Sequence, residues 1–305
     1  MKEIYVIAGP TASGKSAVAV ELAKLVNGEV VSADSMQIYK GMNIGTAKPS
    51  EEEKEGVPHH MIDIVNPDEP YSAALYQQQA RTVIADIHSR NRTPILCGGT
   101  GFYINAVIYD IQFAQNEDAD PHVLYFTNMA ATKGPDHIHK LLHAADPKAA
   151  CAIHPNNIKR VIRALSYNQA TGKLFSDYNS LQKKQPKVYK SVFVCLNMER
   201  QQLYKLIDQR AINMFKAGLE NEVEGLMSQG YHKDLVSMQG IGYKEIIEYL
   251  LGNCTREDAI SSIQQNSRHY AKRQITWFKH QNPYAVSMQA GVKMPMIIAQ
   301  EISMR

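Results

Sequence analysis

The chain has 305 residues, of which 44% are hydrophobic and 21% are charged, and its formal net charge is +3. This composition is that of an ordinary globular protein, and it excludes collagen-like and low-complexity chains. No run of eighteen apolar residues occurs, so the sequence predicts no membrane-spanning helix. The first residues, Met-Lys-Glu-Ile-Tyr-Val-Ile-Ala, form a β-rich run rather than a signal peptide, so we expect a cytoplasmic protein.

The cysteines indicate a reducing compartment. Cys97, Cys151, Cys195 and Cys254 are far apart in the sequence and form no CxxC pair. Each lies in an apolar sequence context. We therefore expect neither a disulfide nor a zinc site built from thiolates.

Strand and helix patterns alternate in the first third of the chain. A β-rich run at residues 3–8 is followed by a glycine-rich turn and a helical pattern at 15–26. A buried strand is expected at 29–33, a helix from an N-cap at Ser72 to about residue 90, and another strand at 94–97. Strands that alternate with helices predict an α/β fold with a parallel sheet covered on both faces.

The alternation of strands and helices stops between about residues 113 and 185. The segment opens with the polar run Gln-Asn-Glu-Asp-Ala-Asp-Pro and then favours helices, including 135–145 and 156–170. We therefore expect a helical insertion domain at 113–185, with a core built from residues 1–112 and 186–305. After the insertion, the patterns predict a core strand at 192–196 and helices at 199–218, 219–229, 242–251 and 256–280.

Positive charge is concentrated in and around the end of the insertion. Between residues 147 and 198, nine lysines and arginines accompany one acid, Asp177, so this segment carries +8 and the rest of the chain −5. Lys159 and Arg163 lie four residues apart, on one face of a predicted helix. A solvated lysine-rich face usually contains interspersed acids, so we favour a polyanionic partner such as a nucleic acid.

A phosphate-binding loop follows the first predicted strand and precedes the first helix. Its sequence fits G-x-x-x-x-G-K-[ST], and its residues are Gly9, Pro10, Thr11, Ala12, Ser13, Gly14, Lys15 and Ser16. In this context, backbone N–H groups cradle a diphosphate, Lys15 supplies a positive charge, and the Ser16 hydroxyl can bind Mg²⁺. The motif predicts a P-loop NTPase-like fold, but it identifies a phosphate rather than a reaction, because most such chains bind ATP or GTP.

Two further motifs follow predicted strands. Residues 34–41 (Asp-Ser-Met-Gln-Ile-Tyr-Lys-Gly) come directly after the second strand, and residues 98–103 (Gly-Gly-Thr-Gly-Phe-Tyr) follow the third. Carboxyl ends of parallel strands form the ligand crevice, so Asp34 and Thr100 should face the phosphate loop. Asp34 could instead cap a turn or hold magnesium through water, and glycine-rich turns such as the second motif are common.

The three motifs together resemble those of the bacterial tRNA dimethylallyltransferase family, the isopentenyl-diphosphate:tRNA transferases. Residues 152–165 (Ala-Ile-His-Pro-Asn-Asn-Ile-Lys-Arg-Val-Ile-Arg-Ala-Leu) are similar to the signature of that family's insertion domain. Residues 240–245 (Gly-Ile-Gly-Tyr-Lys-Glu) and 268–278 (Arg-His-Tyr-Ala-Lys-Arg-Gln-Ile-Thr-Trp-Phe) are similar to its C-terminal signatures. The resemblance extends over about residues 3–282.

The resemblance implies a prenyl transfer to tRNA. The dimethylallyl group of dimethylallyl diphosphate would move to N6 of the adenosine 3′-adjacent to the anticodon, position 37, in tRNAs that read codons starting with U. The diphosphate would lie on residues 11–16 with Mg²⁺ as cofactor, and the target base would be flipped out of its loop. Because N6 is a poor nucleophile, a base must remove its proton, and Asp34 is the family's candidate.

The same resemblance supplies the other predicted catalytic residues. Arg210 matches the position where the family brings an arginine to the departing diphosphate, although a surface ion pair is the alternative. Thr100 is expected to form hydrogen bonds near the adenine or Asp34. Together with Lys15 and the phosphate loop, Arg210 would stabilise the charge that gathers on the leaving group.

The predicted tRNA contacts combine the resemblance with the charge distribution. Ser35, Met36 and Gln37 match the family segment that touches the flipped nucleotide, and Gln37 could read a base edge. Between residues 268 and 280 the last long helix carries basic side chains and no acid. The predicted tRNA-binding residues are Asp34, Ser35, Met36, Gln37, Thr100, Lys159, Arg160, Arg163, Lys244, Arg268, Lys272 and Arg273.

Two other features are expected to be structural. Trp277 and Phe278 could stack on RNA, but such a pair on a helix belongs more often to a core. His137, His139 and His143 have helical spacing that suits a metal, yet no acid or cysteine completes a site, so we expect surface histidines.

The sequence departs from the family pattern in two places. Ser166 stands where members often carry an acid, which puts a local helix contact in doubt. Residues 122–128 lack the arginines that many members place there, so no RNA contact is predicted for them.

Two rival functions share the first motif. A small P-loop kinase would share the fold, but it would not explain the basic insertion. A non-catalytic RNA-binding module would not explain Asp34 and Thr100 at two strand ends beside an intact phosphate loop. We therefore expect a transferase, and we expect it to be a monomer.

Overall fold

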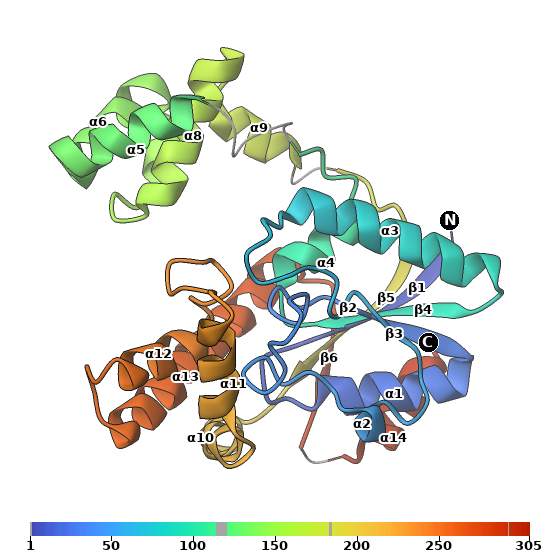
Figure 1. Cartoon of the computed structure of the whole chain (residues 1–305). Coiled ribbons are helices and arrows are strands. Elements are labelled where there is room, and N and C mark those ends of the chain that lie inside the picture. Colours follow the sequence, from blue (N-terminus) through green and yellow to red (C-terminus); the bar gives the residue numbers. More distant parts are fainter. Residues whose placement is uncertain (1, 114–120, 183–184, 292) are drawn as a thin grey trace. The chain divides into compact units, whose positions relative to one another are not determined.

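The computed structural model describes residues 2–113, 121–182, 185–291 and 293–305 (Figure 1). The chain separates into two compact units, one made of Met1–Ile108 with Val188–Arg305 and the other of Tyr109–Lys187. The polar run expected to open the insertion lies outside the described residues as far as residue 120, and so do Lys183 and Lys184. The second unit begins before the expected residue 113 and ends after the expected residue 185.

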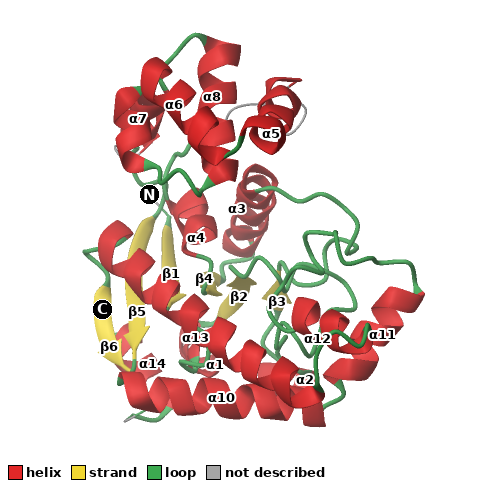
Figure 2. Cartoon of the chain, turned by 90° about the vertical axis from the view of Figure 1, so that its left-hand side faces the viewer, coloured by secondary structure: helices red, strands yellow, loops and turns green. Residues whose placement is uncertain are grey.

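A parallel sheet forms the centre of the larger unit. Within the described residues it has six strands in the order β3-β2-β4-β1-β5-β6, and Figure 2 shows β6 at one edge and β3 at the other. Neighbouring strands pair in parallel, and Val6 of β1 lies opposite Leu96 and Phe193. The expected α/β fold is confirmed. The strands are β1 (Glu3–Ala8), β2 (Gly28–Ser32), β3 (His59–His60), β4 (Thr93–Gly98), β5 (Lys190–Asn197) and β6 (Val286–Gln289).

Helices cover the two faces of this sheet (Figure 1). On one face, α1 (Lys15–Val26) packs against α14 (Pro295–Ser303), and fully buried Leu22 and Ile302 share an apolar cluster with Ile7 of β1. The short α2 (Glu51–Lys54) begins with a capping box at Ser50.

On the other face lie α3 (Ala73–Ser89) and α4 (Gly101–Ile108). The ring of Tyr76 stacks on Tyr103 with centroids 4.0 Å apart, and the Tyr76 hydroxyl donates to the Ser32 carbonyl at 2.7 Å. These contacts fix both helices close to the carboxyl end of β2.

A second group of helices follows β5 and completes the larger unit. Its members are α10 (Arg200–Lys216), α11 (Leu219–Ser228), α12 (Tyr243–Leu250) and α13 (Arg256–Gln281). They bury a second apolar cluster that includes Phe215, Leu219 and Tyr243, and this cluster also takes in Ile38 and Met42 from the segment after β2. The loop that carries Asp34 is therefore packed between the sheet and these helices.

The smaller unit is entirely helical where it is described. It contains α5 (Pro121–Lys133), α6 (Pro135–Ala145), α7 (Pro147–Ala152), α8 (Ile158–Thr171) and α9 (Phe175–Gln182). Ile138, Leu142 and Val161 are fully buried in its own core. The buried Asp146 carboxylate accepts hydrogen bonds from the Ala149 and Ser176 backbone N–H groups at 3.0 and 2.8 Å, which joins α7 to α9. This unit therefore has its own core, independent of the sheet.

Three sequence expectations need correction or comment. Cys151 is exposed, so its apolar sequence context does not bury it. The His139 ring lies 3.1 and 2.9 Å from the Ala150 and Ile153 carbonyls, so it joins α6 to α7 rather than standing free on the surface. Phe278 is 2% exposed, which confirms its place in the core. In the described parts of the chain, every helix is too short or too polar to cross a membrane.

Candidate active site

The phosphate loop joins the end of β1 to the start of α1, as its sequence predicts. Gly9 is required there, because a Cβ atom at this position would lie 2.7 Å from the Leu196 carbonyl oxygen of β5. Gly14 has a φ of 79°, in the left-handed region that favours glycine. These two glycines let the backbone bend tightly between strand and helix, which places the N-terminus of α1 at the cavity described below.

Two side chains of the phosphate loop, Lys15 and Ser13, carry polar groups that a phosphate could bind. The Lys15 ammonium donates to the Pro10 carbonyl at 2.6 Å. The Ser13 hydroxyl is buried and has no hydrogen-bond partner among the described residues. The loop thus holds a hydroxyl without a hydrogen-bond partner and a cation. A bound phosphate oxygen could accept a hydrogen bond from the first and pair with the charge of the second.

Asp34 occupies the first turn after β2. Its Oδ1 atom accepts hydrogen bonds from the backbone N–H groups of Met36 at 2.8 Å and of Gln37 at 3.4 Å. This is the turn-capping role that we considered as the alternative to catalysis. It engages one carboxylate oxygen, and Oδ2 accepts no hydrogen bond from the described residues. The turn fixes the orientation of the carboxylate and leaves one oxygen for a proton.

Thr100 ties the turn after β4 to the turn after β2. Its Oγ1 atom accepts a hydrogen bond from the Ser35 backbone N–H at 3.0 Å and donates to the Ser35 hydroxyl at 3.3 Å. Gly98 permits this approach, because a Cβ atom there would lie 2.1 Å from the Ala33 carbonyl oxygen. Thr100 and the Asp34–Ser35 turn therefore lie together at the carboxyl ends of two neighbouring strands.

Two cavities open beside these loops and share part of their walls. One, of about 340 Å³, is lined by Thr11, Asp34 and Tyr270 among other residues. The other, of about 890 Å³, is lined by Lys15 and Ser16 among other residues. Arg210 and Met214, one turn apart on α10, line both cavities. The carboxylate side and the phosphate-loop side therefore adjoin at these two side chains.

The cations of the site are withdrawn from water. Desolvation lowers the pKa of Lys15, and the Asp34 charge acts against this shift. Desolvation likewise lowers the pKa of Arg210, opposed by the charges of Asp34 and Glu53. An arginine stays protonated in spite of such a shift, so Arg210 brings a fixed positive charge to the common wall. An anion bound there would replace part of the lost hydration.

Ser16 suits the magnesium-binding role expected of it. It is exposed and lines the larger cavity beside Lys15. Among the described residues, no group of three or more His, Cys, Asp or Glu side chains is placed to hold a metal. Mg²⁺ at phosphate sites is commonly held by one or two protein oxygens together with phosphate oxygens and water. A single hydroxyl at the mouth of the phosphate loop fits such a site.

The predicted tRNA contacts of the larger unit fall into two groups. Ser35, Met36, Lys244 and Arg273 line the Asp34 cavity. Lys272 lies outside that cavity and is exposed. Two others are engaged within the protein: the Gln37 amide accepts from Ser32 and donates to the Ala47 carbonyl at 3.2 Å, and Arg268 pairs with Asp208. A base-reading role for Gln37 stays a prediction, because its amide hydrogen-bonds within the protein and supports the turn.

In the helical unit, the basic residues of α8 differ in their surroundings. Lys159 and Arg160 are exposed. The Arg163 guanidinium lies over the Phe175 ring, 5.9 Å from its centroid, so it packs against the unit's own core. Exposed cations are the more available for a phosphate, so Lys159 and Arg160 are the stronger candidates of the three.

Two residues of α13 were missed as members of the site. Tyr270 lines the Asp34 cavity, and burial raises its pKa to about 12, to which the Asp34 charge contributes. Gln274 is 5% exposed and contacts both the phosphate loop and the turn after β4. The sequence contains a signal for Gln274, because this polar residue stands between Ala271 and Phe278 on the apolar face of the helix. A polar residue on a buried face indicates a specific hydrogen-bonding role.

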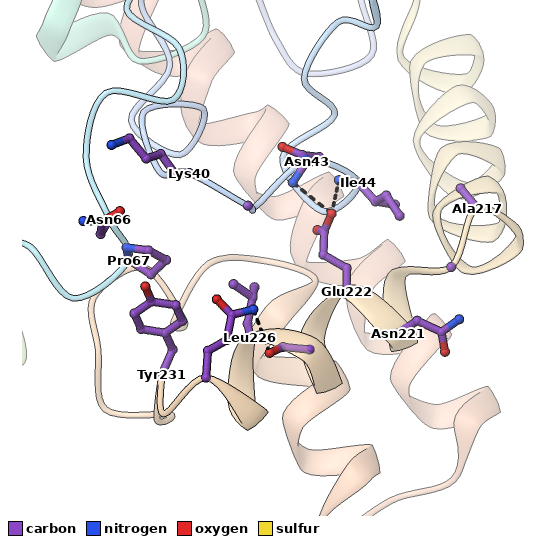
Figure 3. Close-up of a pocket in the computed structure, with 14 residues that line it drawn as sticks. Lys40, Asn43, Ile44, Asn66, Pro67, Ala217, Asn221, Glu222, Leu226 and Tyr231 are labelled. Atoms are coloured by element: carbon purple, nitrogen blue, oxygen red, sulfur yellow. Dashed lines mark hydrogen bonds between the residues drawn. The ribbon is translucent and has the colours of Figure 1, made fainter.

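A third cavity, of about 590 Å³, lies beside the loop that follows Asp34 (Figure 3). There the Glu222 carboxylate accepts backbone hydrogen bonds from Asn43, Ile44 and Gly45 at 2.9, 2.8 and 3.2 Å. The Tyr243 hydroxyl donates to the same carboxylate at 2.6 Å. Gly45 also lines the Asp34 cavity, so Glu222 fixes one wall of the site from outside.

The chain is similar to known proteins over most of its length. The family model described as IPP transferase matches residues 37–281. A "tRNA dimethylallyltransferase" of Lachnoclostridium phytofermentans is 46% identical over 92% of this chain and 90% of its own length. A "tRNA dimethylallyltransferase" of Caldanaerobacter subterraneus is 48% identical over 91% of this chain and 89% of its own length.

Solved structures show the same likeness. The tRNA delta(2)-isopentenylpyrophosphate transferase of Staphylococcus epidermidis has a TM-score of 0.73 and 40% identity, covering 100% of this chain and 98% of its own. A eukaryotic dimethylallyltransferase described as acting on tRNA has a TM-score of 0.82 and 30% identity, covering 95% of this chain and 74% of its own. The resemblance that the motifs indicated is confirmed over nearly the whole chain, which belongs to the IPP transferase family.

Proposed function

We propose that this chain transfers the dimethylallyl group of dimethylallyl diphosphate to N6 of the adenosine at position 37 of tRNA, in tRNAs that read codons starting with U. The products are N6-(dimethylallyl)adenosine and diphosphate. The observation that carries the proposal is the common wall of the two cavities at Arg210 and Met214. A phosphate-binding loop on one side and a carboxylate on the other suit a reaction in which a leaving diphosphate and an attacking amine meet.

The diphosphate of the donor binds at the phosphate loop. Lys15 lies at the N-terminus of α1, and the buried Ser13 hydroxyl lacks a partner among the described residues. When bound, Mg²⁺ would be held by the Ser16 hydroxyl and phosphate oxygens, where it neutralises charge on the diphosphate. The family's activity and the donor set of the loop both support this assignment.

The acceptor base enters the cavity that Asp34 lines. The N6 lone pair attacks the first carbon of the allyl group, the bond between that carbon and the diphosphate oxygen breaks, and the electron pair leaves with the diphosphate. The N6 proton passes to the Asp34 carboxylate. Because Oδ1 is held by the Met36 and Gln37 backbone, Oδ2 is the oxygen assigned to receive the proton. General bases of this kind contribute about 10²–10⁴-fold to a rate.

Arg210 acts on the charge that develops during transfer. Its guanidinium lies in the wall between the two cavities and has lost hydration. A cation fixed near the leaving oxygens interacts more strongly with the transition state than with the ground state, because negative charge gathers there as the bond breaks. Arg210 therefore favours bond cleavage.

The tRNA anticodon stem-loop is assigned to basic and polar residues of both units. In the larger unit these are the cavity residues Ser35, Met36, Lys244 and Arg273 with the exposed Lys272. In the helical unit they are Lys159 and Arg160. Contacts of lysine and arginine with phosphates supply affinity that depends on salt. The concentration of positive charge between residues 147 and 198 supports this part of the proposal.

The test uses dimethylallyl diphosphate labelled in its allyl group, Mg²⁺ and unmodified tRNA with adenosine at position 37. The proposal predicts label in the RNA and equimolar release of diphosphate. A tRNA with guanosine at that position is the matched control, and it should remain unlabelled. Consumption of ATP without labelling of RNA would point to a kinase, and retention of RNA with neither outcome would point to a binding module. Either result would overturn the proposal.

A further inference from the structure

One glutamine on α13 contacts both halves of the site. The Gln274 side-chain oxygen accepts a hydrogen bond from the Thr11 backbone N–H in the phosphate loop at 2.8 Å. Its side-chain nitrogen donates to the Gly99 carbonyl, next to Thr100, at 3.0 Å. One planar amide therefore joins the loop assigned to the donor with the turn that supports Asp34.

The surroundings of this amide leave it little freedom. Gln274 is 5% exposed. A Cβ atom at Gly99 would lie 2.2 Å from the Gln274 nitrogen, and a Cβ atom at Gly101 would lie 2.1 Å from the Trp277 ring. Helix α13 thus lies directly against the glycine-rich turn, and at Gly101 the Trp277 ring leaves no room for a Cβ atom.

Further contacts hold α13 in this position. The Trp277 ring meets Phe102 edge-on with centroids 6.3 Å apart. The buried Asn282 amide donates to the Asn105 side chain at 2.9 Å. Helix α13 is thus fixed along α4 at these points, and Ala12 of the phosphate loop packs against the apolar cluster that includes Ala271 of the same helix. The hydrogen bond between the Gln274 amide and the Thr11 N–H ties the phosphate loop to this helix.

We propose that Gln274 is a positioning residue that sets the separation between the phosphate loop and the Thr100–Asp34 side of the site. This inference rests on the proposed prenyl transfer. The two substrates bind to different cavities, and only the transfer step requires their reacting atoms to be in register. Near-attack geometry is sensitive to displacements of about 1 Å, which can cost about 10²-fold in rate. Loss of the amide should therefore affect transfer far more than it affects the binding of either substrate.

The first experiment compares Gln274→Met with Gln264→Met. Gln264 lies on the same helix and donates to the Asp208 carbonyl at 3.2 Å, away from both loops, so it is a matched control. We expect Gln274→Met to lower the single-turnover rate of transfer about 10- to 100-fold. Its Kd values for dimethylallyl diphosphate and for tRNA, each measured alone, should change less than about twofold. A transfer rate equal to that of the control would overturn the inference, and so would a rate loss explained by weaker binding.

A second variant keeps the inference testable if Gln274→Met folds poorly. In Gln274→Glu, the protonated carboxyl can accept from Thr11 and donate to Gly99, whereas the ionised form loses the donor and repels the Gly99 carbonyl. The transfer rate relative to wild type should therefore rise as the pH falls. A ratio that is constant with pH would overturn the inference.

The wild-type chain separates this inference from the proposed function. If wild-type protein fails to label tRNA in the same assay, the proposed function is wrong and the inference fails with it. If wild-type protein labels tRNA and Gln274→Met does so equally fast, the positioning role alone is wrong.

Discussion

The Thr100 hydroxyl accepts a hydrogen bond from the Ser35 backbone N–H at 3.0 Å, and this bond joins the carboxyl ends of β4 and β2. The two strands are neighbours in the sheet, so the turns that follow them are brought together by the parallel topology. Asp34 lies one residue before Ser35. The carboxylate that we assign as general base is thus held by its own turn and, through Ser35, by a side chain from the turn that follows a different strand.

Replacement of Thr100 by valine should test this support. Thr100→Val keeps the shape of the side chain but leaves the Ser35 N–H without its acceptor, at a cost of about 1 kcal/mol in the free energy of unfolding. We expect the transfer rate to fall, because Asp34 loses a restraint. Urea denaturation and single-turnover labelling measure the two effects. Thr100→Ser retains the hydroxyl and should remain close to wild type. Comparable rates for the Val and Ser variants would show that the hydroxyl is dispensable.

Glu222 should matter to the site without touching a substrate. Its carboxylate accepts hydrogen bonds from three backbone N–H groups and from the Tyr243 hydroxyl. In Glu222→Gln, an NH₂ group takes the place of one carboxylate oxygen and faces donors that have lost their acceptor. We expect a loss of about 1–3 kcal/mol in the free energy of unfolding and a higher KM for tRNA, because Gly45 lines the acceptor cavity. Glu224→Gln changes an exposed carboxylate on the same helix and serves as the control. If both variants behave alike, the contacts of Glu222 have no special role.

A buried carboxylate should make the stability of the larger unit depend on acid pH. Hydrogen bonding to Arg90 is the main cause that lowers the pKa of Glu29 to about 2 from an ordinary value of 4.5, with help from His60 and against its burial. Because the pKa is lowered in the folded state, the stabilisation is present above pH 4.5 and is lost as the pH falls toward 2.

The size of this effect is on the order of 1–3 kcal/mol, since the arginine partner is partly exposed and screened. Urea denaturation between pH 2 and 5 should show a steeper loss of stability for wild type than for Glu29→Gln. Glu52→Gln, at an exposed position, should follow the wild-type curve. Parallel curves for wild type and Glu29→Gln would contradict the assignment.

Exposed cations of the helical unit should contribute to tRNA affinity through phosphates. Lys159→Ala is expected to weaken tRNA binding and to lower the slope of log Kd against log salt concentration by about one. Lys205→Ala, which removes an exposed lysine from α10, is the control. A salt slope for Lys159→Ala equal to the wild-type slope would place Lys159 away from the phosphates.

The sequence predicted the central strands and the phosphate loop because their patterns are local. A strand such as β1 is a continuous apolar run, and the glycines of the loop have fixed spacing. Strand β3 has two residues and exists only through its pairing with β2, so no periodicity could indicate it. Helix α14 was missed although Ile298, Ala299 and Ile302 have helical spacing, and its identity is clear only from its packing on α1.

In the candidate site, too, some features follow from the sequence pattern and others depend on tertiary packing. Asp34 and Thr100 could be placed at the same edge of the sheet, because the carboxyl ends of parallel strands meet there. Arg210 and Met214 could not be placed in a shared wall, because that depends on how α10 packs against the loops. The role of Gln37 was predicted from the family resemblance, whereas its amide contacts Ser32 and Ala47 within the protein. Tertiary packing therefore decides which polar side chains remain available.

The most direct test of the central claim is single-turnover transfer by Asp34→Asn, measured with the binding of dimethylallyl diphosphate. The asparagine oxygen can still accept from the Met36 and Gln37 backbone N–H groups, so the turn should survive while the base is lost. We predict a rate about 10²–10⁴-fold below wild type, with diphosphate binding unchanged. A wild-type rate in this variant would contradict the account, because the proton would then leave N6 without the Asp34 carboxylate.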